Sequence, residues 1–283
     1  MTADSFVNQA TTSSAPVGLS TFLGVFTPTI LTILGAIMYL RFGWVVANGG
    51  IWGAVAIVVI ANLITAVTAL SVSALSTNMR VGAGGAYFMI SRSLGLEIGG
   101  AIGLPLFLSQ AISLTLYCYG LAECIQMFWP EAPVSILAGT LVLVVSALAA
   151  RSTVFALKMQ IPIMAFVGLS ILSLLLGADW GGSPDPSLGT YQDASFWGLF
   201  AVFFPAVTGI LAGVSLSGDL ADPERSLPRG TLLAVIAGAV IYLIIPVALG
   251  LSGDFQTLSK PLAWMEVAWV GVLIIPGLWG AVL

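Results

Sequence analysis

The sequence predicts an all-α polytopic membrane protein, and its composition is the first reason. Of the 283 residues, 59% are hydrophobic and only 7% are charged, whereas about 25% of the residues of a soluble protein are charged. Apolar runs that are long enough to cross a bilayer, which takes about 20 helical residues, recur along the chain. The first and the sixth run contain helix-breaking residues. These observations predict a helical bundle of two inverted repeats of five spans, the second of them incomplete.

Seven complete spans and the start of an eighth follow one another. They cover residues 21–47, 51–76, 96–129, 133–150, 155–177, 196–220 and 229–251, with the eighth opening near residue 262. We expect residues 1–20 to form a disordered cytoplasmic tail, because they are polar and lack the basic start of a signal peptide. Residues 21–283 then form the transmembrane domain, with the first repeat over 21–177 and the partial second repeat over 196–283.

The basic residues predict the orientation of these spans. Alternate loops carry Arg80, Arg92, Arg151, Lys158, Arg225 and Arg229, whereas the loops between them carry only Lys260. Loops rich in Lys and Arg stay on the cytoplasmic side of a membrane. We therefore expect an integral protein of the plasma (inner) membrane with its N-terminus in the cytoplasm.

The two interrupted spans lie five spans apart. The first contains Pro28, Thr29, Thr32 and Gly35, and the sixth contains the stretch FFPAVTGILAG at residues 203–213. A broken helix offers unpaired carbonyls at one end and unpaired N–H groups at the other, and these attract cations and anions respectively. Inside a membrane such backbone is tolerated only where it lines a cavity or is buried in protein. The alternative for the G-x-x-x-G pair Gly209 and Gly213 is close helix packing.

Charged residues are scarce inside the spans. Away from the loops, the spans hold only Arg41, Glu123 and, at the inner end of the sixth, Asp219, so no midplane carboxylate is available to neutralise a bound cation. A co-bound anion would supply that charge, which argues for salt transport without net charge movement. Arg41 and Glu123 lie at similar depth near the outer ends of their spans, and we expect them to form an outer gate. The alternative is that both side chains snorkel toward the interface.

Several other functions are excluded or disfavoured. The chain has no histidine, so imidazole metal sites and histidine bases are absent, and we expect no cofactor and no enzymatic activity. Cys118 and Cys124 are expected to be free thiols packed in a helix. The glycine-rich residues 81–95 lack the GK[ST] of a phosphate loop, so we expect them to pack between spans. The acidic residues 219–224 are expected to form a solvated helix end, and we expect no nucleic-acid partner.

Three motifs resemble the cation-chloride cotransporters of the amino acid–polyamine–organocation superfamily, in their prokaryotic-type form. They are GGAYFMISRSLGLEIGGAIG at residues 84–103, YGLAE at 119–123 and FFPAVTGILAGVSLSGDLADPERSLPRGTL at 203–232. The resemblance runs from about residue 22 to the end. It implies a leucine-transporter-type fold and electroneutral symport of chloride with potassium, sodium or both by alternating access. The expected substrates are chloride and alkali cations, and the protein is expected to lie in the lipid bilayer. A homodimer is the assembly we consider.

The resemblance also implies binding residues. The family's potassium site corresponds to Thr32, Ile33, Tyr117, Pro205 and Thr208. Its chloride sites use backbone amides that correspond to Gly35, Ala36 and Ile37 in the first span and to Gly209, Ile210 and Leu211 in the sixth. Its sodium site uses carbonyls that correspond to Leu31 and Leu34, together with hydroxyls of the eighth span. No other metal is implied.

Two departures from the family pattern affect these expectations. Thr32 stands where the family commonly has asparagine, and the sequence stops at GLWGAVL, where the eighth span would supply sodium ligands. We therefore expect a C-terminally truncated second repeat. Two alternatives remain open: an amino-acid permease of the same superfamily, and a truncated fragment that does not transport. The single glycine of TILGAI suits a monatomic ion better than the carboxylate of an amino acid.

Overall fold

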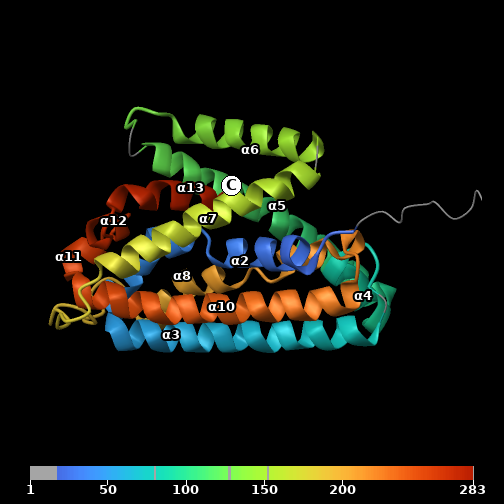
Figure 1. Cartoon of the computed structure of the whole chain (residues 1–283), viewed down its shortest axis with the longest axis horizontal. Coiled ribbons are helices and arrows are strands. Elements are labelled where there is room, and N and C mark those ends of the chain that lie inside the picture. The colour runs from blue at the N-terminus through green and yellow to red at the C-terminus, as the bar shows by residue number, and fades with distance from the viewer. Residues whose placement is uncertain (1–17, 80, 127–128, 152, 283) are drawn as a thin grey trace, which may run out of the picture.

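A computed structural model describes residues 18–79, 81–126, 129–151 and 153–282, and within them the protein is an all-helical bundle (Figure 1). Its α-helices are α2 (Thr27–Ile33), α3 (Ala36–Asn78), α4 (Gly85–Leu94), α5 (Leu96–Gln126), α6 (Val134–Arg151), α7 (Thr153–Gly177), α8 (Phe196–Phe203), α9 (Leu211–Ser215), α10 (Pro223–Ser252), α11 (Phe255–Leu258), α12 (Trp264–Val267) and α13 (Ile274–Val282). Shorter turns are η1 (Phe22–Phe26), η2 (Phe204–Val207), η3 (Ser217–Asp219) and η4 (Gly271–Leu273). Most of the predicted tail, residues 1–17, lies outside the described residues.

The predicted spans fall on these helices. Five helical segments of the described chain are long and apolar enough to cross a membrane. The first of them, Phe22–Asn78, contains both the first and the second predicted span. α6 is shorter in its apolar part but occupies the place predicted for the fourth span. The prediction of an all-α polytopic membrane protein is therefore confirmed.

Gly50 separates the first two spans. Its φ of 64° and ψ of −179° interrupt the helical backbone of α3, and this left-handed φ favours glycine, which has no Cβ. A Cβ at this position would also lie 3.2 Å from the Cα of Gly189 in the long loop before α8. The connection between the first two predicted spans, at residues 48–50, is thus a tight turn, which allows residues 36–49 and 51–78 to run as separate spans.

The eighth span begins later than predicted. The sequence predicts its start near residue 262, but the chain there forms only the short turns α12 and η4 before α13 begins at Ile274. Ser173 in α7 explains the delay, because its carbonyl accepts the Trp269 N–H at 2.9 Å. Its hydroxyl accepts from the Val270 N–H at 2.9 Å and donates to the Val270 carbonyl at 3.1 Å. These bonds satisfy backbone groups that would otherwise favour a continuous apolar helix.

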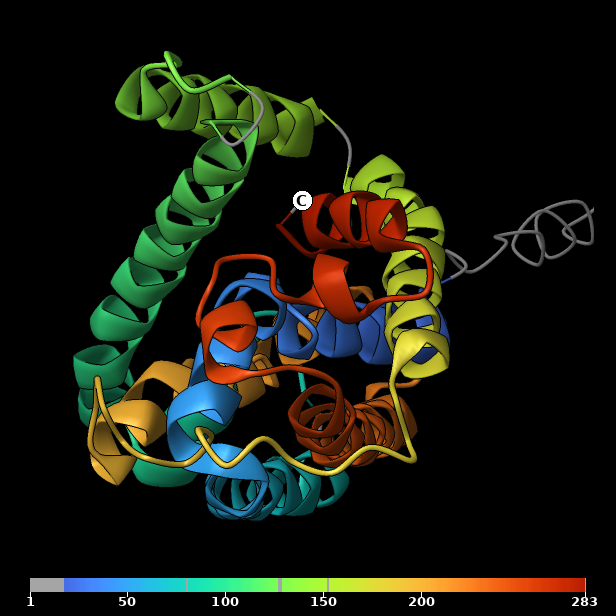
Figure 2. The same ribbon diagram turned by 90° about the vertical axis from the view of Figure 1, so that its left-hand side faces the viewer.

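Helix α10 packs along α3 and α2 with one face, while Leu233, Ile236 and Val240 on its other face are exposed. Its Tyr242 is fully buried against Phe42 of α3 and Phe203 of α8, with ring centroids 5.6 and 5.2 Å away. In contrast, α5 crosses one side of the molecule at an angle and α6 follows at its far end (Figure 2). The core therefore lies around the two interrupted spans, and α5 closes one side of it.

The two ends of the bundle differ in their basic residues. Helix α4, which contains Arg92, lies at one end of the long axis, together with the end of α6 at Arg151 (Figure 1). The turns α11 and α12, which flank Lys260, lie at the opposite end. This arrangement agrees with the alternation of basic and non-basic loops in the sequence.

Candidate functional site

The first interruption lies between α2 and α3. Helix α2 ends at Ile33, Leu34 leaves the helical region with φ −83° and ψ 41°, and Gly35 is extended. The Thr32 hydroxyl donates to the Pro28 carbonyl at 2.7 Å. No side chain caps the first turn of α3, so its leading N–H groups remain available to a ligand.

The second interruption lies between η2 and α9. Pro205 introduces a tight turn, and both the N–H and the hydroxyl of Thr208 donate to the Pro205 carbonyl, at 3.3 and 2.7 Å. Gly209 and Ile210 then lead into the five-residue helix α9. Proline lacks a donor and glycine is flexible, so Pro205 and Gly209 close together disfavour an ordinary helix, and here the helix is interrupted. Both predicted interruptions are confirmed.

The two interruptions contact one another directly. A Cβ on Gly209 would lie 2.7 Å from the Cβ of Thr32, and a Cβ on Gly213 would lie 2.6 Å from the Thr29 Oγ1. The G-x-x-x-G pair therefore packs the sixth span onto the first. Close packing and interruption, which the sequence presented as alternatives, occur together.

The start of the first span is also joined to the end of the sixth. The Leu19 N–H donates to the Asp219 carbonyl at 2.7 Å, and the Ala221 N–H donates to the Leu19 carbonyl at 3.1 Å. The Thr21 and Ser226 hydroxyls lie 2.8 Å apart. The start of the first span is thus held against the segment that leaves the sixth.

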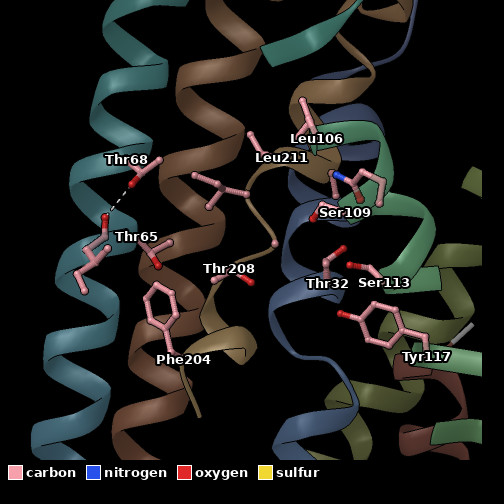
Figure 3. Close-up of a pocket in the computed structure, with 15 residues that line it drawn as sticks. Thr32, Thr65, Thr68, Leu106, Ser109, Ser113, Tyr117, Phe204, Thr208 and Leu211 are labelled. Carbon is pink, nitrogen blue, oxygen red and sulfur yellow. Dashed lines mark hydrogen bonds between the residues drawn. The ribbon is translucent and has the colours of Figure 1, made fainter. Parts of the chain in front are cut away.

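A cavity of about 340 Å³ opens beside the paired interruptions (Figure 3). Its lining comes from α2, α3, α5 and the interrupted sixth span, and consists of Thr32, Ile64, Thr65, Thr68, Leu106, Ser109, Gln110, Ser113, Tyr117, Phe204, Thr208, Gly209, Ile210, Leu211 and Ala212. Figure 3 shows the hydroxyls of Ser113 and Tyr117 pointing toward Thr32. Hydroxyls, one amide and backbone groups supply the polarity, and no Asp, Glu, Lys or Arg is among these fifteen residues.

Three of the five predicted potassium-site residues, Thr32, Tyr117 and Thr208, line this cavity. Ile33 does not line it: this residue is buried, and its carbonyl accepts a hydrogen bond from the Tyr242 hydroxyl at 2.6 Å. Pro205 does not line the cavity, although its carbonyl is held by Thr208 at the cavity edge.

The predicted anion ligands lie at the starts of the two second half-helices. Gly209, Ile210 and Leu211 line the cavity. Gly35, Ala36 and Ile37 open α3, and a Cβ on Gly35 would lie 3.5 Å from the Tyr117 hydroxyl. Both sets of amides are therefore close to groups predicted to bind the cation.

A second cavity of about 380 Å³ lies on the other side of Thr32 and Tyr117, between α2, α5, α7 and α13. Leu31, one of the predicted sodium ligands, lines it together with Gln160. Leu34, the other predicted ligand, is buried in the core and does not line it.

The predicted outer pair is not formed in this conformation. Arg41 and Glu123 are both exposed, and no ion pair between them is present in the described chain. The ion pairs that are present join Arg225 to Asp222 and Lys260 to Glu266, at 3.8 and 3.2 Å.

Three further sequence predictions agree with the structure. The segment before α5 packs tightly on the sixth span, since a Cβ on Gly85 would lie 3.0 Å from the Val214 carbonyl oxygen. Asp222 caps the exposed start of α10 by accepting the Arg225 N–H at 3.3 Å. Both cysteines are free and buried.

Sequence reasoning missed part of the cavity wall. Ser109, Ser113 and Tyr117 follow one another at four-residue spacing on α5, so they form a polar stripe along one face of this helix. This spacing is visible in the sequence and could have revealed the wall. Thr65 was also missed, and its hydroxyl links α3 to the sixth span by donating to the Val207 carbonyl at 3.2 Å.

Comparisons with known proteins agree with this architecture. A family model described as "Amino acid permease" matches residues 24–259. The chain is 32% identical to solute carrier family 12 member 2 of Mus musculus over 274 residues, which cover 88% of this chain and 23% of that protein. It is 34% identical to member 3 of Mus musculus, with 90% and 29% covered, and 33% identical to member 1 of Homo sapiens, with 80% and 23% covered.

The chain thus spans less than a third of the length of these relatives. The relatives are solute carriers and not enzymes. Its apolar spans make it an integral membrane protein. Because the family model covers most of the sequence, from the first interrupted span to beyond α11, the chain belongs to the amino acid permease family.

Proposed function

We propose that the chain carries the ion-binding part of a secondary transporter that moves chloride together with potassium, sodium or both, without net charge movement. The motifs that resemble cation-chloride cotransporters support this proposal, as do the similar solute carriers. Transport by alternating access follows from the paired interrupted helices, which are typical of such carriers.

The observation that carries the proposal is the absence of ionised side chains among the residues that line the cavity of about 340 Å³ beside the two interruptions. An alkali cation that leaves water without a counter-charge loses several kcal/mol. No carboxylate lines this cavity to offset that loss. A chloride bound nearby would offset it, and the ion pair would then cross the membrane as a neutral unit.

Each ion binds at a polar end of a broken helix. The cation site consists of Thr32, Ile33, Tyr117, Pro205 and Thr208, which supply hydroxyl and carbonyl oxygens. One chloride binds the amides of Gly35, Ala36 and Ile37, and a second binds those of Gly209, Ile210 and Leu211. These amides begin half-helices, where the helix dipole favours an anion. Where sodium participates, the carbonyls of Leu31 and Leu34 contribute to its site.

We further propose that Arg41 and Glu123 pair in another conformation and close the outer entrance. In the structure described here, both side chains are exposed and separate, so the pair has to form during the transport cycle. The excess of basic residues at one end of the bundle supports a cytoplasmic N-terminus in the plasma (inner) membrane. A homodimer is the proposed assembly.

Uptake of radioactive chloride into liposomes that contain the purified chain tests this function. We expect uptake to require potassium or rubidium and to be insensitive to an imposed membrane potential. Thermal unfolding in detergent provides a second measurement, because ions that bind only the folded state raise the unfolding temperature. Uptake of an amino acid without halide would instead establish the amino-acid permease, which is the competing function.

A further inference from the structure

Tyr242 lies outside the cavity lining, yet its hydroxyl reaches the interruption of the first span. The residue is in the middle of α10 and is fully buried. Its hydroxyl donates to the carbonyl oxygen of Ile33 at 2.6 Å, which is a short hydrogen bond. Ile33 is the last residue of α2, so this bond is made at the point where the helix stops.

The position of this carbonyl explains why it requires an external donor. In a continuous helix, the Ile33 carbonyl would accept the N–H of Ile37, but the interruption places Ile37 in the next helix, α3. A buried carbonyl without a donor is costly, and the membrane interior provides no bulk water to replace it. The Tyr242 hydroxyl therefore takes the role of the missing helical N–H.

The ring of Tyr242 has little freedom to move away. It packs edge-on against Phe42, which follows the interruption of the first span, and against Phe203, which precedes the interruption of the sixth. One turn earlier on α10, a Cβ on Gly238 would lie 2.7 Å from the Ile33 side chain, so α10 and α2 are in close contact. These contacts fix the direction of the hydroxyl and, through it, the direction of the carbonyl.

We infer that Tyr242 is a positioning residue of the cation site, which holds the Ile33 carbonyl in a fixed direction while leaving its second lone pair for the transported cation. A carbonyl oxygen has two lone pairs, so one hydrogen bond does not exhaust it. This inference rests on the proposed function, because it requires Ile33 to be a cation ligand. It adds α10 to the elements that determine cation binding.

The test is Tyr242→Phe, which removes the hydroxyl and retains the ring. The purified full chain is titrated with potassium at saturating chloride, and the midpoint of the rise in unfolding temperature is measured. We expect the midpoint to increase about fivefold, the effect of losing one buried hydrogen bond. We also expect the preference for potassium over caesium to decrease, because a carbonyl that can reorient discriminates less between cation sizes. The chloride midpoint at saturating potassium should remain unchanged.

Tyr39→Phe is the matched control. Tyr39 is also buried, packs its ring on Trp264 with centroids 4.9 Å apart, and shares a hydrogen bond of 2.6 Å with Ser170. The control therefore loses the same group from a comparably buried position, but the partner is a side chain of α7 and not a carbonyl at the interruption. We expect it to lower the unfolding temperature without ions and to leave the potassium midpoint unchanged.

Three results would overturn the inference. The first is a Tyr242→Phe variant that is less stable but retains the wild-type potassium midpoint and cation preference. The second is an equal increase of the midpoint in both tyrosine variants, which would indicate general loosening of the core. The third is a wild-type chain that responds to none of potassium, rubidium and sodium in the presence of chloride. Only the third would also overturn the proposed function, so the two failures can be distinguished.

Discussion

Gly209 packs directly on Thr32, so the interruption of the sixth span and the interruption of the first form one contact. A Cβ on Gly209 would lie 2.7 Å from the Thr32 Cβ and Cγ2, and 3.0 Å from its carbonyl carbon. The neighbouring atoms include backbone, which cannot rotate away as a side chain can. The distance between the two sets of proposed ion ligands therefore depends on the absence of a side chain at this one position.

Gly209→Ala should separate the two interruptions. The added methyl group has no space, and overpacking of this kind costs about 1–3 kcal/mol of stability. We expect the unfolding temperature to fall and the potassium-induced rise in that temperature to be reduced or lost. Gly168→Ala in α7 is the control, because a Cβ there meets nothing within 4 Å. A Gly209→Ala variant with wild-type stability and ion response would contradict the proposed role of this contact.

Ser113→Ala tests the polar stripe on α5. Ser113 lines the cavity and points toward Thr32 and Tyr117 (Figure 3). Loss of its hydroxyl should weaken the apparent potassium affinity about fivefold, as expected for one lost polar contact. The control is Thr115→Ala on the same helix, whose exposed hydroxyl donates to the Ala111 carbonyl at 3.2 Å. Equal effects of the two changes would show that the stripe has no specific role.

Tyr117→Phe tests the predicted cation ligand on α5. Its hydroxyl lies near Gly35, at the gap between α2 and α3, and we expect its removal to raise the potassium concentration required for half-maximal chloride uptake. The chloride requirement at saturating potassium should change less. Tyr119→Phe is the control, because Tyr119 is two residues further along α5 and 40% exposed. An unchanged potassium requirement in Tyr117→Phe would remove this residue from the cation site.

The interrupted spans could be predicted from local chemistry alone. Pro205 and Gly209 lie within five residues of one another and together disfavour a regular helix, and Pro28 and Gly35 do so in the first span. A single proline such as Pro105 lies inside a continuous helix, so the clustering is the signal. The free, buried thiols could also be predicted, because the cysteines lie within an apolar run. These features depend on the residues themselves, so one sequence is sufficient to identify them.

Features that depend on distant partners could not be predicted. Residues 262–273 read as the start of a span, but Ser173, 97 positions before Val270 in the sequence, binds the backbone of Trp269 and Val270 between the turns α12 and η4. The bond from Tyr242 to the Ile33 carbonyl joins residues 209 positions apart. Neither pair has a local sequence signal. The stripe from Ser109 to Tyr117 was different, since its four-residue spacing was present in the sequence.

Charge reversal tests the proposed outer gate. Arg41→Glu and Glu123→Arg should each slow chloride uptake, and the double variant should restore part of the loss. An exposed ion pair contributes about 0–1 kcal/mol, so we expect each single change to slow uptake no more than about fivefold. If both single variants transport at the wild-type rate, the side chains do not form a gate and instead extend separately toward the membrane interface.

Asp254 should make the segment that contains α11 sensitive to acid. Its carboxylate caps α11 by accepting the Thr257 N–H at 2.9 Å. Hydrogen bonding by Thr257, assisted by the nearby charge of Lys260, lowers the pKa of Asp254 below its ordinary 3.8. A carboxylate with a lowered pKa stabilises the folded segment at pH values above its ordinary pKa. This contribution is lost as the pH falls through the lowered pKa.

Hydrogen exchange of residues 255–259, corrected for its intrinsic pH dependence, measures this effect. We expect protection to be constant from pH 7 to about 5 and to decrease below about pH 4, where Asp254 becomes protonated. Asp254→Asn is the control, because asparagine is also a good helix cap but does not titrate. This variant should keep its protection across the same pH range, because its cap does not change with pH. The Leu258 carbonyl of α11 then stays close to Gly43 of α3. A loss of protection in the asparagine variant at the same pH would assign the acid sensitivity to another group.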